Sequence, residues 1–315
     1  MSNNDEFIQQ YKIIDDLGEG AFAKVYLARK KDTDELIAVK VIDKSKCEVD
    51  LFKNELSIQR KFDSPYIINI YSYFETSESF TILMEYANGG ELFQAIVDNR
   101  SYSENDAATI IQQILIGLKI LHDNNVIHRD LKPANLLLSI DYEKDTTTVK
   151  ISDFGLAGII SNDKLESEFY GSRPYSAPEI IEGTPYDSSV DIWSLGVIVF
   201  ILLGGYYPFE SDSDFELENK ILNAEYDFNG PEWNEISQEA RDFITQMLQV
   251  DPKNRITIED ALKHPWLSGN APKVQLGDLR EHLKAFNLKQ KLKRVANATK
   301  TAIKFKNLLK NKNDE

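Results

Sequence analysis

The chain has 315 residues, of which 42% are hydrophobic, and its formal net charge at pH 7 is −15. This length and composition suit a globular protein with a sizeable core. The sequence contains no apolar run of about 18 residues that could cross a membrane, and MSNNDEFIQQ at the N-terminus has no secretion-signal pattern. A single cysteine, Cys47, allows no internal disulfide, and the four histidines are too scattered to form a zinc site. We therefore expect a cytoplasmic protein.

The first predicted element is a glycine-rich hairpin in LGEGAFAKVY, residues 17–26. Two glycines lie between stretches of alternating apolar residues, which favours a strand, a tight turn and a returning strand. Because glycine lacks a Cβ, the backbone amides of such a turn can approach phosphates closely. An ordinary hairpin explains the glycine pair equally well. If the turn covers a nucleotide, the residues beside it are Leu17, Gly18, Glu19, Gly20, Ala21, Phe22, Ala23, Lys24 and Val25.

The next apolar run, LIAVKVI at 36–42, is a predicted strand that contains a single lysine, Lys40. A cation in a buried run needs a partner, and nucleotide phosphates or Glu55 in the following segment can supply one. Leu51, Phe52 and Leu56 surround Glu55 at helical spacing, which predicts a helix with Glu55 on its inner face. A snorkelling surface lysine and a solvated glutamate are the plainer alternative.

A third apolar run, TILMEYA at 81–87, leads into NGGELF, which predicts a strand, an extended hinge and then a helix. A purine base would fit at this hinge, where backbone groups of Glu85 and Ala87 would bind its edge. Met84 would guard the deeper pocket, with Ala38 of the preceding strand in its lining. A plain strand and turn fits locally just as well, and only the distance along the chain from Lys40 favours the base site.

The most informative stretch is HRDLKPAN at 128–135, followed by DFG at 153–155. It fixes the spacing of Asp130, Asn135 and Asp153. One carboxylate can accept the proton of an attacking hydroxyl, while an amide and a second carboxylate can hold the magnesium ions that neutralise a transferred phosphoryl group. An isolated HRD has little specificity, but the order and spacing of all these motifs predict phosphoryl transfer from ATP.

Residues 11–267 resemble a eukaryotic protein serine/threonine kinase domain of the calcium/calmodulin-dependent kinase group. The resemblance implies an α+β, bilobal fold: a small β-rich N-lobe at 11–86 with one regulatory helix, and a large, mainly helical C-lobe at 87–267. Residues 1–10 would be a short extension. One departure from the usual glycine loop is Ala23, which stands at its third glycine. Seven ordered motifs carry the resemblance: GEGAFAKV, AVKVI, HRDLKPANLLL, DFGLA, APE, DIWSLGVIVFILLGGYYPF and DPKNRITIEDALKHPWL.

The resemblance also implies a role for each matching residue around ATP. Asp130 acts as the base and Lys132 steadies the γ-phosphate. Lys40 binds the α- and β-phosphates and pairs with Glu55. Lys132 followed by Pro indicates a Ser or Thr acceptor. Magnesium is coordinated by the two remaining motif residues, Asn135 and Asp153.

Two further implied roles are structural. Glu179 of APE pairs with Arg255 as a buried ion pair. Asp191, near the start of the central helix, braces the catalytic loop. An inactive, kinase-shaped scaffold would lack Lys40, Asp130 or Asp153, and all three are present in this chain.

Substrate choice is predicted from Glu91, which falls where related kinases bind an arginine upstream of the acceptor. A carboxylate can bind a guanidinium through two hydrogen bonds, which selects Arg over Lys. Two other acidic positions of the most arginine-demanding relatives are Ala134 and Ile201 here. We expect one basic specificity site, about three residues upstream of the acceptor. The alternative is that Glu91 only stabilises the start of a helix.

The segment from Asp153 to Glu179 departs from its family at Glu168, where many relatives carry a phosphorylatable threonine. A fixed carboxylate there could pair with Arg129 and partly order the segment, because its charge is smaller than that of a phosphate. We therefore expect activity without phosphorylation of this segment, and a solvated glutamate is the alternative. Other possible phosphosites are Ser161, Ser167 and Ser172. GSRPY at 171–175 also departs from the commoner Thr-Pro order, so the preference just after the acceptor is open.

Charge is distributed unevenly along the chain. Residues 1–278 carry 25 basic and 48 acidic side chains, a net −23, whereas 279–312 carry 11 basic and one acidic, a net +10. SGNAPKVQ at 268–275 has the composition of a linker. After it, Leu279, Leu283 and Phe286 form one apolar stripe, and a second begins at Leu288 and Leu292, with Phe305 thirteen residues beyond Leu292.

A basic amphipathic helix of this kind suits calmodulin or a membrane surface. It resembles the autoinhibitory and calmodulin-binding segment of calmodulin-dependent kinases, so we expect 268–315 to block the substrate cleft until Ca²⁺/calmodulin captures it. A tail that merely docks, attachment to anionic lipid or nucleic acid, and a calmodulin-independent kinase of the same group remain alternatives. The chain contains no calcium-binding loop of its own. We expect a monomer that acts on proteins and binds no nucleic acid.

Overall fold

The computed structural model describes residues 9–19, 23–46, 49–99, 101–160, 171–277 and 279–293. These residues divide into two compact units. The first consists of the described residues up to Phe52, of Asn69–Tyr86 and of the residues from Ala285 onward. The second consists of Lys53–Ile68 and Ala87–Lys284. Each unit is described by itself.

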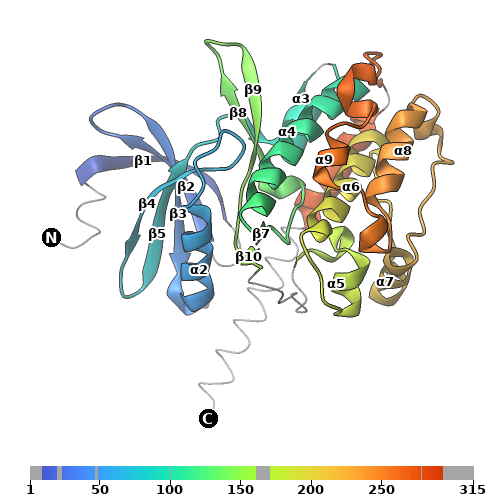
Figure 1. Cartoon of the computed structure of the whole chain (residues 1–315). Coiled ribbons are helices and arrows are strands. Elements are labelled where there is room, and N and C mark those ends of the chain that lie inside the picture. The colour runs from blue at the N-terminus through green and yellow to red at the C-terminus, as the bar shows by residue number, and fades with distance from the viewer. Residues whose placement is uncertain are drawn as a thin grey trace. The chain divides into compact units, whose positions relative to one another are not determined.

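The first unit is built around one antiparallel sheet with the strand order β1-β2-β3-β5-β4 (Figure 1). One face of the sheet carries a small core in which Ala28, Ile37, Val39 and Leu83 are buried, with Tyr11, Tyr26, Val41 and Phe74 packed around them. Successive side chains of a strand point to opposite faces, so every second residue is available for the other face. The strands are β1 (Tyr11–Glu19), β2 (Ala23–Lys30), β3 (Leu36–Asp43), β4 (Ile70–Glu75) and β5 (Ser79–Glu85).

The helix predicted after β3 is present as α2, Val49–Gln59, preceded by a short 3-10 turn at Lys44–Lys46. This helix belongs to both units, because the division between them falls after Phe52. On the sheet side of that turn, the Lys44 ammonium bonds the Glu75 carboxylate at 2.8 Å and lies over the Phe80 ring. These contacts tie the end of β3 to the β4–β5 turn.

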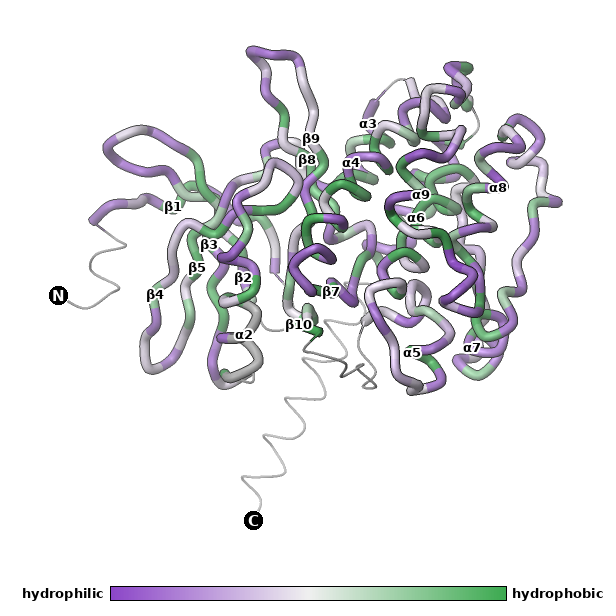
Figure 2. The backbone as a smooth tube through the Cα atoms, viewed as in Figure 1, coloured by the Kyte–Doolittle hydropathy of each residue, from purple (hydrophilic) through white to green (hydrophobic). Residues whose placement is uncertain are grey.

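The second unit is mainly helical and is organised around α6, Ser189–Gly204. Every residue of α6 from Val190 to Gly204 is buried, as expected for a helix that is apolar on all sides. Figure 2 shows the hydrophobic stretches gathered in the interior of this unit and the hydrophilic ones on its outer loops. The other helices are α3 (Leu92–Asp98), α4 (Glu104–Asp123), α5 (Pro178–Glu182), α7 (Asp214–Leu222), α8 (Gln238–Met247) and α9 (Ile258–Ala261).

Two short sheets in the second unit carry the central motifs. The first has the order β6-β8-β9, formed by Gly90–Glu91, Leu136–Asp141 and Thr146–Ile151. The second pairs β7, Val126–Ile127, with β10, Gly158–Ile159. The HRD sequence follows β7 directly and the DFG sequence follows β9. The predicted α+β organisation, with a β-rich unit and a helical unit, is thus confirmed.

The segment 268–275, predicted to be a linker, packs along the start of α4. The Asn105 amide donates to the Pro272 carbonyl at 3.0 Å, and the Leu276 amide donates to the Tyr102 carbonyl at 2.9 Å. Ala271 and Leu276 are only 5% and 6% exposed. The polar composition of the segment did not indicate that Ala271 within it and Leu276 directly after it are buried.

Residues 279–293 are helical. The first stripe is buried, with Leu279, Leu283 and Phe286 between 0% and 6% exposed. In the second unit, Arg280 Nε donates to the Val97 carbonyl at 3.1 Å. A Cβ placed on Gly205 would lie 2.4 Å from the His282 Cβ, so the helix closely approaches the end of α6. None of the described helices combines the length and apolar character needed to cross a lipid bilayer.

Candidate active site

The turn after β7 is held by one buried carboxylate. Asp191 of α6 accepts the backbone amide of His128 through Oδ2 and that of Arg129 through Oδ1, each at 2.9 Å. Arg129 has a positive φ of 65°, a conformation that costs energy for a residue with a side chain. Two consecutive amides bonded to the same carboxylate compensate that cost. The predicted bracing role of Asp191 is therefore confirmed.

Asp191 is fully buried, yet its charged form is favoured. Burial by itself raises the pKa of this carboxyl, but the hydrogen bond from His122, the charges of His122 and His128 and the His128 amide outweigh it, so that the pKa lies below its usual value. His122 Nε2 is 2.9 Å from Asp191 Oδ2. Since an ionised carboxylate only accepts hydrogen bonds, His122 Nε2 carries the hydrogen.

Asp130 is the centre of a compact polar cluster. Its carboxylate accepts the Ser172 hydroxyl at 2.9 Å through Oδ1 and the Lys132 ammonium through Oδ2. Lys132 also donates to Ser172 Oγ at 3.2 Å. Asn135 Nδ2 donates to the Asp130 carbonyl at 2.8 Å. With 8% of its surface exposed, Asp130 is buried and is fixed on several sides.

Gly171 is what allows Ser172 to approach this cluster. Its φ is +103°, and a Cβ at this position would lie 2.5 Å from the Arg129 carbonyl oxygen. Only glycine adopts this backbone without strain. Sequence reasoning proposed Ser172 as a phosphosite and missed its contacts with Asp130 and Lys132.

The predicted magnesium ligands lie close together in the second unit. The Ser152 amide donates to the Asn135 carbonyl at 2.9 Å, and Asp153 is the next residue. Because Asn135 Nδ2 donates to the Asp130 carbonyl, the orientation of the side-chain amide is fixed. Its oxygen then points away from that carbonyl. An amide oxygen and a carboxylate are hard oxygen donors, which suit Mg²⁺. The donor set therefore fits the expected ion.

The Phe154 ring lies below this loop, fully buried, with its centroid 5.2 Å from the His128 ring in an edge-on contact. His128 Nε2 is 3.1 Å from the Ser152 carbonyl. The DFG and HRD motifs are thus packed against each other. This contact keeps Asp153 next to the loop that carries Asp130.

Arg129 extends along β10. A Cβ on Gly158 would lie 1.4 Å from Arg129 Nη2, so the guanidinium rests directly on the glycine backbone. The Arg129 guanidinium carbon also lies 6.0 Å from the centre of the Tyr186 ring. The predicted partner of Arg129, Glu168, lies outside the described residues.

In the first unit, several of the predicted nucleotide residues share one face of the sheet. Val25 is the cross-strand partner of Lys40, and Gly18 is the partner of Val25. Ala38 is two residues before Lys40 on β3 and is paired with Met84. Directly paired residues, and residues two apart on one strand, point to the same face. This face is opposite to the small core around Val39.

Lys24 does not point to that face. It alternates with Val25, and its ammonium bonds the Asp16 carboxylate of β1 at 2.8 Å. The hydrogen bond to Asp16 and its negative charge raise the pKa of Lys24. The hydrogen bond from Lys24 and its positive charge lower the pKa of Asp16. The glycine-loop prediction counted consecutive residues and did not separate the two faces of the strand.

The predicted hinge residues are partly occupied by bonds within the chain. The Glu85 amide donates to the Asn69 carbonyl at 2.9 Å, and the Ala87 carbonyl accepts the Gly90 amide at 3.2 Å. Leu17, by contrast, is 42% exposed at the end of β1, and Glu19 is the partner of Lys24.

Glu91 is placed by strand pairing. It is paired with Leu137 of β8, two residues after Asn135, and it is the N-cap residue of α3 without a side-chain capping bond. Upstream, the Asn88 side chain donates to the Ile140 carbonyl at 2.9 Å and accepts its amide at 2.7 Å. The alternative role of Glu91, a carboxylate at the start of α3 that the helix dipole stabilises, requires no capping bond and stays a prediction.

The predicted ion pair between Glu179 and Arg255 is confirmed. Arg255 Nη1 and Nη2 bond Glu179 Oε1 and Oε2 at 2.8 and 3.1 Å, and the Arg255 side chain is completely buried. Both residues lie in the second unit, where they join α5 to the turn before α9. The residues of the prediction that lie outside the described part of the chain are Gly20, Ala21, Phe22, Ser161, Ser167, Glu168 and Phe305, together with the side chains of Leu51, Phe52 and Glu55.

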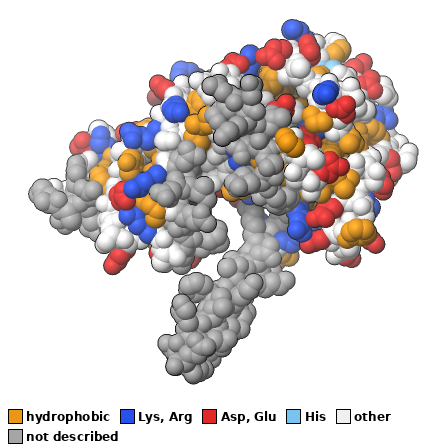
Figure 3. Space-filling view, turned by 60° about the horizontal axis from the view of Figure 1, so that its bottom comes forward, with side chains coloured by type: hydrophobic (Ala, Val, Ile, Leu, Met, Phe, Trp, Pro, Cys, Tyr) orange, Lys and Arg blue, Asp and Glu red, His pale blue; other side chains and the backbone are white. Residues whose placement is uncertain are grey.

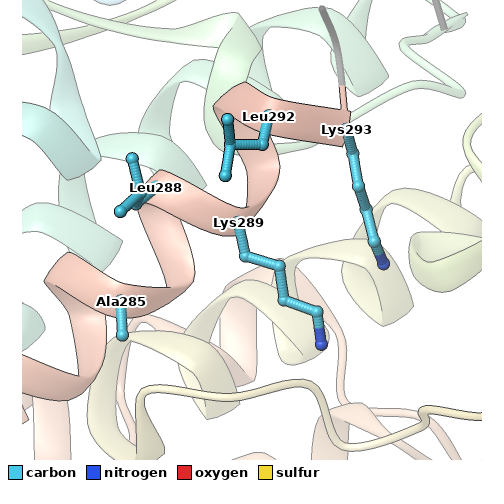
Figure 4. A pocket seen from close by; sticks show the side chains of 5 residues that line it. All are labelled: Ala285, Leu288, Lys289, Leu292 and Lys293. Atoms are coloured by element: carbon cyan, nitrogen blue, oxygen red, sulfur yellow. The ribbon is translucent and has the colours of Figure 1, made fainter. Parts of the chain in front are cut away.

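Leu292 lies on the exposed side of the C-terminal helix. Leu288 and Leu292 are 59% and 63% exposed, in contrast to the buried first stripe. Figure 4 shows the two leucines side by side on the helix, with Lys289 and Lys293 extending away from them. These four residues and Ala285 line a hollow. The described part of the tail thus offers apolar side chains with cations beside them.

Comparison with known proteins agrees with this geometry. Residues 11–267 match the protein kinase domain model. The chain is 41% identical over 296 residues to calcium/calmodulin-dependent protein kinase type 1 of Caenorhabditis elegans, covering 92% of this chain and 84% of that protein. It is 43% identical over 263 residues to myosin light chain kinase A of Dictyostelium discoideum, covering 82% of this chain and 88% of that protein. The identity to calcium/calmodulin-dependent protein kinase type 1B of Homo sapiens is 39% over 293 residues, covering 92% of this chain and 84% of that protein.

The chain therefore belongs to the protein kinase domain family. It is an enzyme, a protein serine/threonine kinase of the calcium/calmodulin-dependent kinase group. Kinases of this family use ATP and, in general, Mg²⁺.

Proposed function

We propose that the chain transfers the γ-phosphoryl group of ATP to a Ser or Thr hydroxyl of a protein, with Asp130 as the general base. The observation that carries this assignment is the cluster of Asp130, Lys132, Ser172 and Asn135 on the braced loop. These bonds fix the position of Asp130, and a general base needs a fixed position to meet the proton that it accepts.

In the reaction, the acceptor oxygen forms a bond to the γ-phosphorus while the bond to the β,γ-bridging oxygen breaks, and ADP leaves. The hydroxyl proton passes to the Asp130 carboxylate. Lys132 is close enough to Asp130 to compensate negative charge beside it, and Lys40 would bind the nucleotide phosphates from the sheet. Asn135 and Asp153 would hold Mg²⁺, which supplies charge neutralisation on the triphosphate when it is bound.

Replacement of the base tests this assignment. Asp130→Asn should lower kcat by about 10²- to 10⁴-fold, the range of general-base catalysis, with little change in the KM for ATP. Asp145→Asn in the exposed β8–β9 turn is the matched control, because Asn tolerates its positive φ of 52°. An Asp130→Asn variant as fast as the control would refute the assignment.

We propose that Glu91 selects an arginine about three residues upstream of the acceptor. Support comes from its pairing with Leu137, just beyond Asn135. Glu91→Gln should lower kcat/KM for a peptide with upstream Arg and leave it unchanged for the same peptide with Ala. Equal losses for both peptides would contradict the proposal.

We also propose that the kinase is active without phosphorylation of its activation segment, because Glu168 supplies a fixed negative charge for Arg129. Glu168→Val should lower peptide turnover, and Glu166→Val, two residues away, serves as the control. Unchanged turnover of Glu168→Val in unphosphorylated enzyme would remove the proposal.

For regulation, we propose that the tail inhibits the enzyme and that Ca²⁺/calmodulin relieves the inhibition by binding the stripe that begins at Leu288. The proposal is supported by the exposure of Leu288 and Leu292 next to lysines, by the acidic body of the chain and by relatives whose names state calmodulin dependence. Figure 3 shows acidic side chains spread over the visible face of the helical unit. The buried first stripe, including Leu283, would stay docked.

Truncation after Asn287 separates the two stripes, since it keeps the buried one and removes the exposed one. Basal activity should rise and the response to Ca²⁺/calmodulin should disappear. In the full chain, Leu288→Glu with Leu292→Glu should abolish calmodulin binding, whereas Val274→Glu, at a position 72% exposed in the same tail, should not. Full activity that never responds to calmodulin would favour the calmodulin-independent alternative.

A further inference from the structure

His122, a residue that none of the sequence motifs includes, is joined to the catalytic loop through Asp191. It lies in the last turn of α4, and its Nε2 is 2.9 Å from Asp191 Oδ2. The same oxygen accepts the His128 amide, while the other oxygen accepts the Arg129 amide. One carboxylate therefore receives a side-chain donor from α4 and two backbone donors from the turn before Asp130.

The three donors define the orientation of the carboxylate. The two amides fix one edge of the group, but both belong to the strained turn that the carboxylate itself has to hold. His122 is the donor that comes from outside this turn, from the last turn of α4. His122 therefore links the position of the turn to α4.

Burial makes this contact consequential. Asp191 is completely buried and the His122 side chain is 12% exposed, so water does not readily replace the lost donor. A buried carboxylate deprived of one hydrogen bond rotates toward another donor or draws water in. Either change shifts the amides of His128 and Arg129, and with them the position of Asp130 one residue later.

We propose that His122 is a positioning residue for phosphoryl transfer, which sets the geometry of the general base Asp130 through the Asp191 carboxylate. The proposal rests on the proposed role of Asp130. His122 acts through Asp191 in this proposal and does not contact substrate or nucleotide. A displacement of the base by about 1 Å can cost up to about 100-fold in rate, so an effect on kcat is expected.

The length of the substituted side chain provides the test. In His122→Gln the amide nitrogen can take the place of Nε2 and donate to Asp191, whereas in His122→Asn it ends near the place of Nδ1 and falls short. His122→Leu has similar volume but no donor. We expect kcat of His122→Asn and His122→Leu to fall by about 10- to 100-fold with the KM for ATP within about twofold, and His122→Gln to retain most of the wild-type kcat.

A second readout is independent of turnover. Hydrogen exchange of the His128 and Arg129 amides should be faster in His122→Asn than in the wild type and restored in His122→Gln. Gln113→Leu is the matched control on α4, because it also removes a side-chain bond of this helix, from Gln113 Oε1 to the Val149 amide at 2.8 Å. It should leave kcat and the exchange of both loop amides unchanged.

The outcomes separate this inference from the proposed function. Equal kcat and equal amide exchange for the Gln and Asn variants overturn the role of His122, and so does a kcat loss matched by Gln113→Leu. If His122→Leu does not fold, the comparison of Gln with Asn decides alone. Wild-type enzyme no faster than Asp130→Asn in the same assay would instead refute the role of Asp130.

Discussion

At the scale of single residues, the best-predicted features are those whose spacing along the chain is short. Asp130 and Asn135 are five residues apart, and the loop between them fixes their mutual geometry, as the bond between Asn135 Nδ2 and the Asp130 carbonyl shows. His122 was missed because a single histidine near the end of a helix has no distinctive pattern. Its partner Asp191 lies 69 residues further along the chain, and only folding brings the two together.

The lowered pKa of Asp191 predicts how stability depends on pH. Because the folded-state pKa lies below the ordinary value of 3.8, ionised Asp191 stabilises the fold above that value, and the contribution is lost as pH falls through the folded-state pKa. The free energy of unfolding of the wild type should therefore exceed that of Asp191→Asn at neutral pH, with a difference that shrinks below pH 3.8. Urea unfolding at a series of pH values measures this difference.

The exposed Asp145→Asn substitution provides the control for this titration. It should leave the free energy of unfolding close to the wild-type value at every pH. A difference between wild type and Asp191→Asn that stays constant down to pH 2 would contradict the assignment of the stabilising charge to Asp191.

A second buried carboxylate, Glu104, supports the helical core without touching the active site. It accepts the Ser237 amide at 2.7 Å, the Ser237 hydroxyl at 2.6 Å and the Trp266 indole N–H at 3.0 Å. Glu104→Ala leaves these donors unsatisfied and should lower the free energy of unfolding by about 3 kcal/mol. The midpoint of guanidinium unfolding measures this loss, and the exposed Glu235→Ala should stay within about 0.5 kcal/mol of wild type.

At the scale of elements, local signals predicted most helices and strands. The glycine hairpin, the Lys40 strand and the buried central helix are all present, because apolar periodicity reflects which face of each element is buried. The prediction that 268–275 is a free linker was wrong, because one buried residue within it, Ala271, and one directly after it, Leu276, do not stand out in a polar sequence. The face to which Lys24 points was also missed, although strand alternation would have indicated it.

The start of α4 allows a test of one element in isolation. Ser103 Oγ accepts the Asp106 amide, and Asp106 Oδ2 accepts the Ser103 amide at 2.8 Å. Ser103→Ala should lower the free energy of unfolding by about 1 kcal/mol, as for other lost helix caps. Thermal unfolding measures it, with the exposed Ser101→Ala as control. At a permissive temperature kcat should not change, because His122 lies at the opposite end of the helix.

At the scale of the whole molecule, charge predicts how salt affects regulation. Residues 1–278 carry a net −23 and residues 279–312 a net +10, so attraction between body and tail should contribute to inhibition. The Debye length falls from about 30 Å at 0.01 M to about 8 Å at 0.15 M salt, which weakens such attraction. Basal activity of the full chain, measured by peptide phosphorylation without calmodulin, should therefore rise over this range.

The chain truncated after Asn287 controls for direct effects of salt on catalysis. Its activity should change little over the same range, since most of the basic residues of the tail are absent. A parallel rise in both proteins would show that salt acts on the catalytic domain, and that body–tail attraction contributes nothing measurable to inhibition.

The hairpin of β8 and β9 has one constrained end and one free end. Its strands are held by Asn88, which bonds the backbone of Ile140, and by Gln113, which bonds the Val149 amide. At the tip, Tyr142 is 77% exposed, and the three residues after it are exposed as well. The tip is therefore a suitable attachment point for a fluorophore or an affinity tag. A reporter inserted there should leave phosphoryl transfer unchanged. This turn is therefore a suitable attachment site for single-molecule or immobilised assays of the kinase.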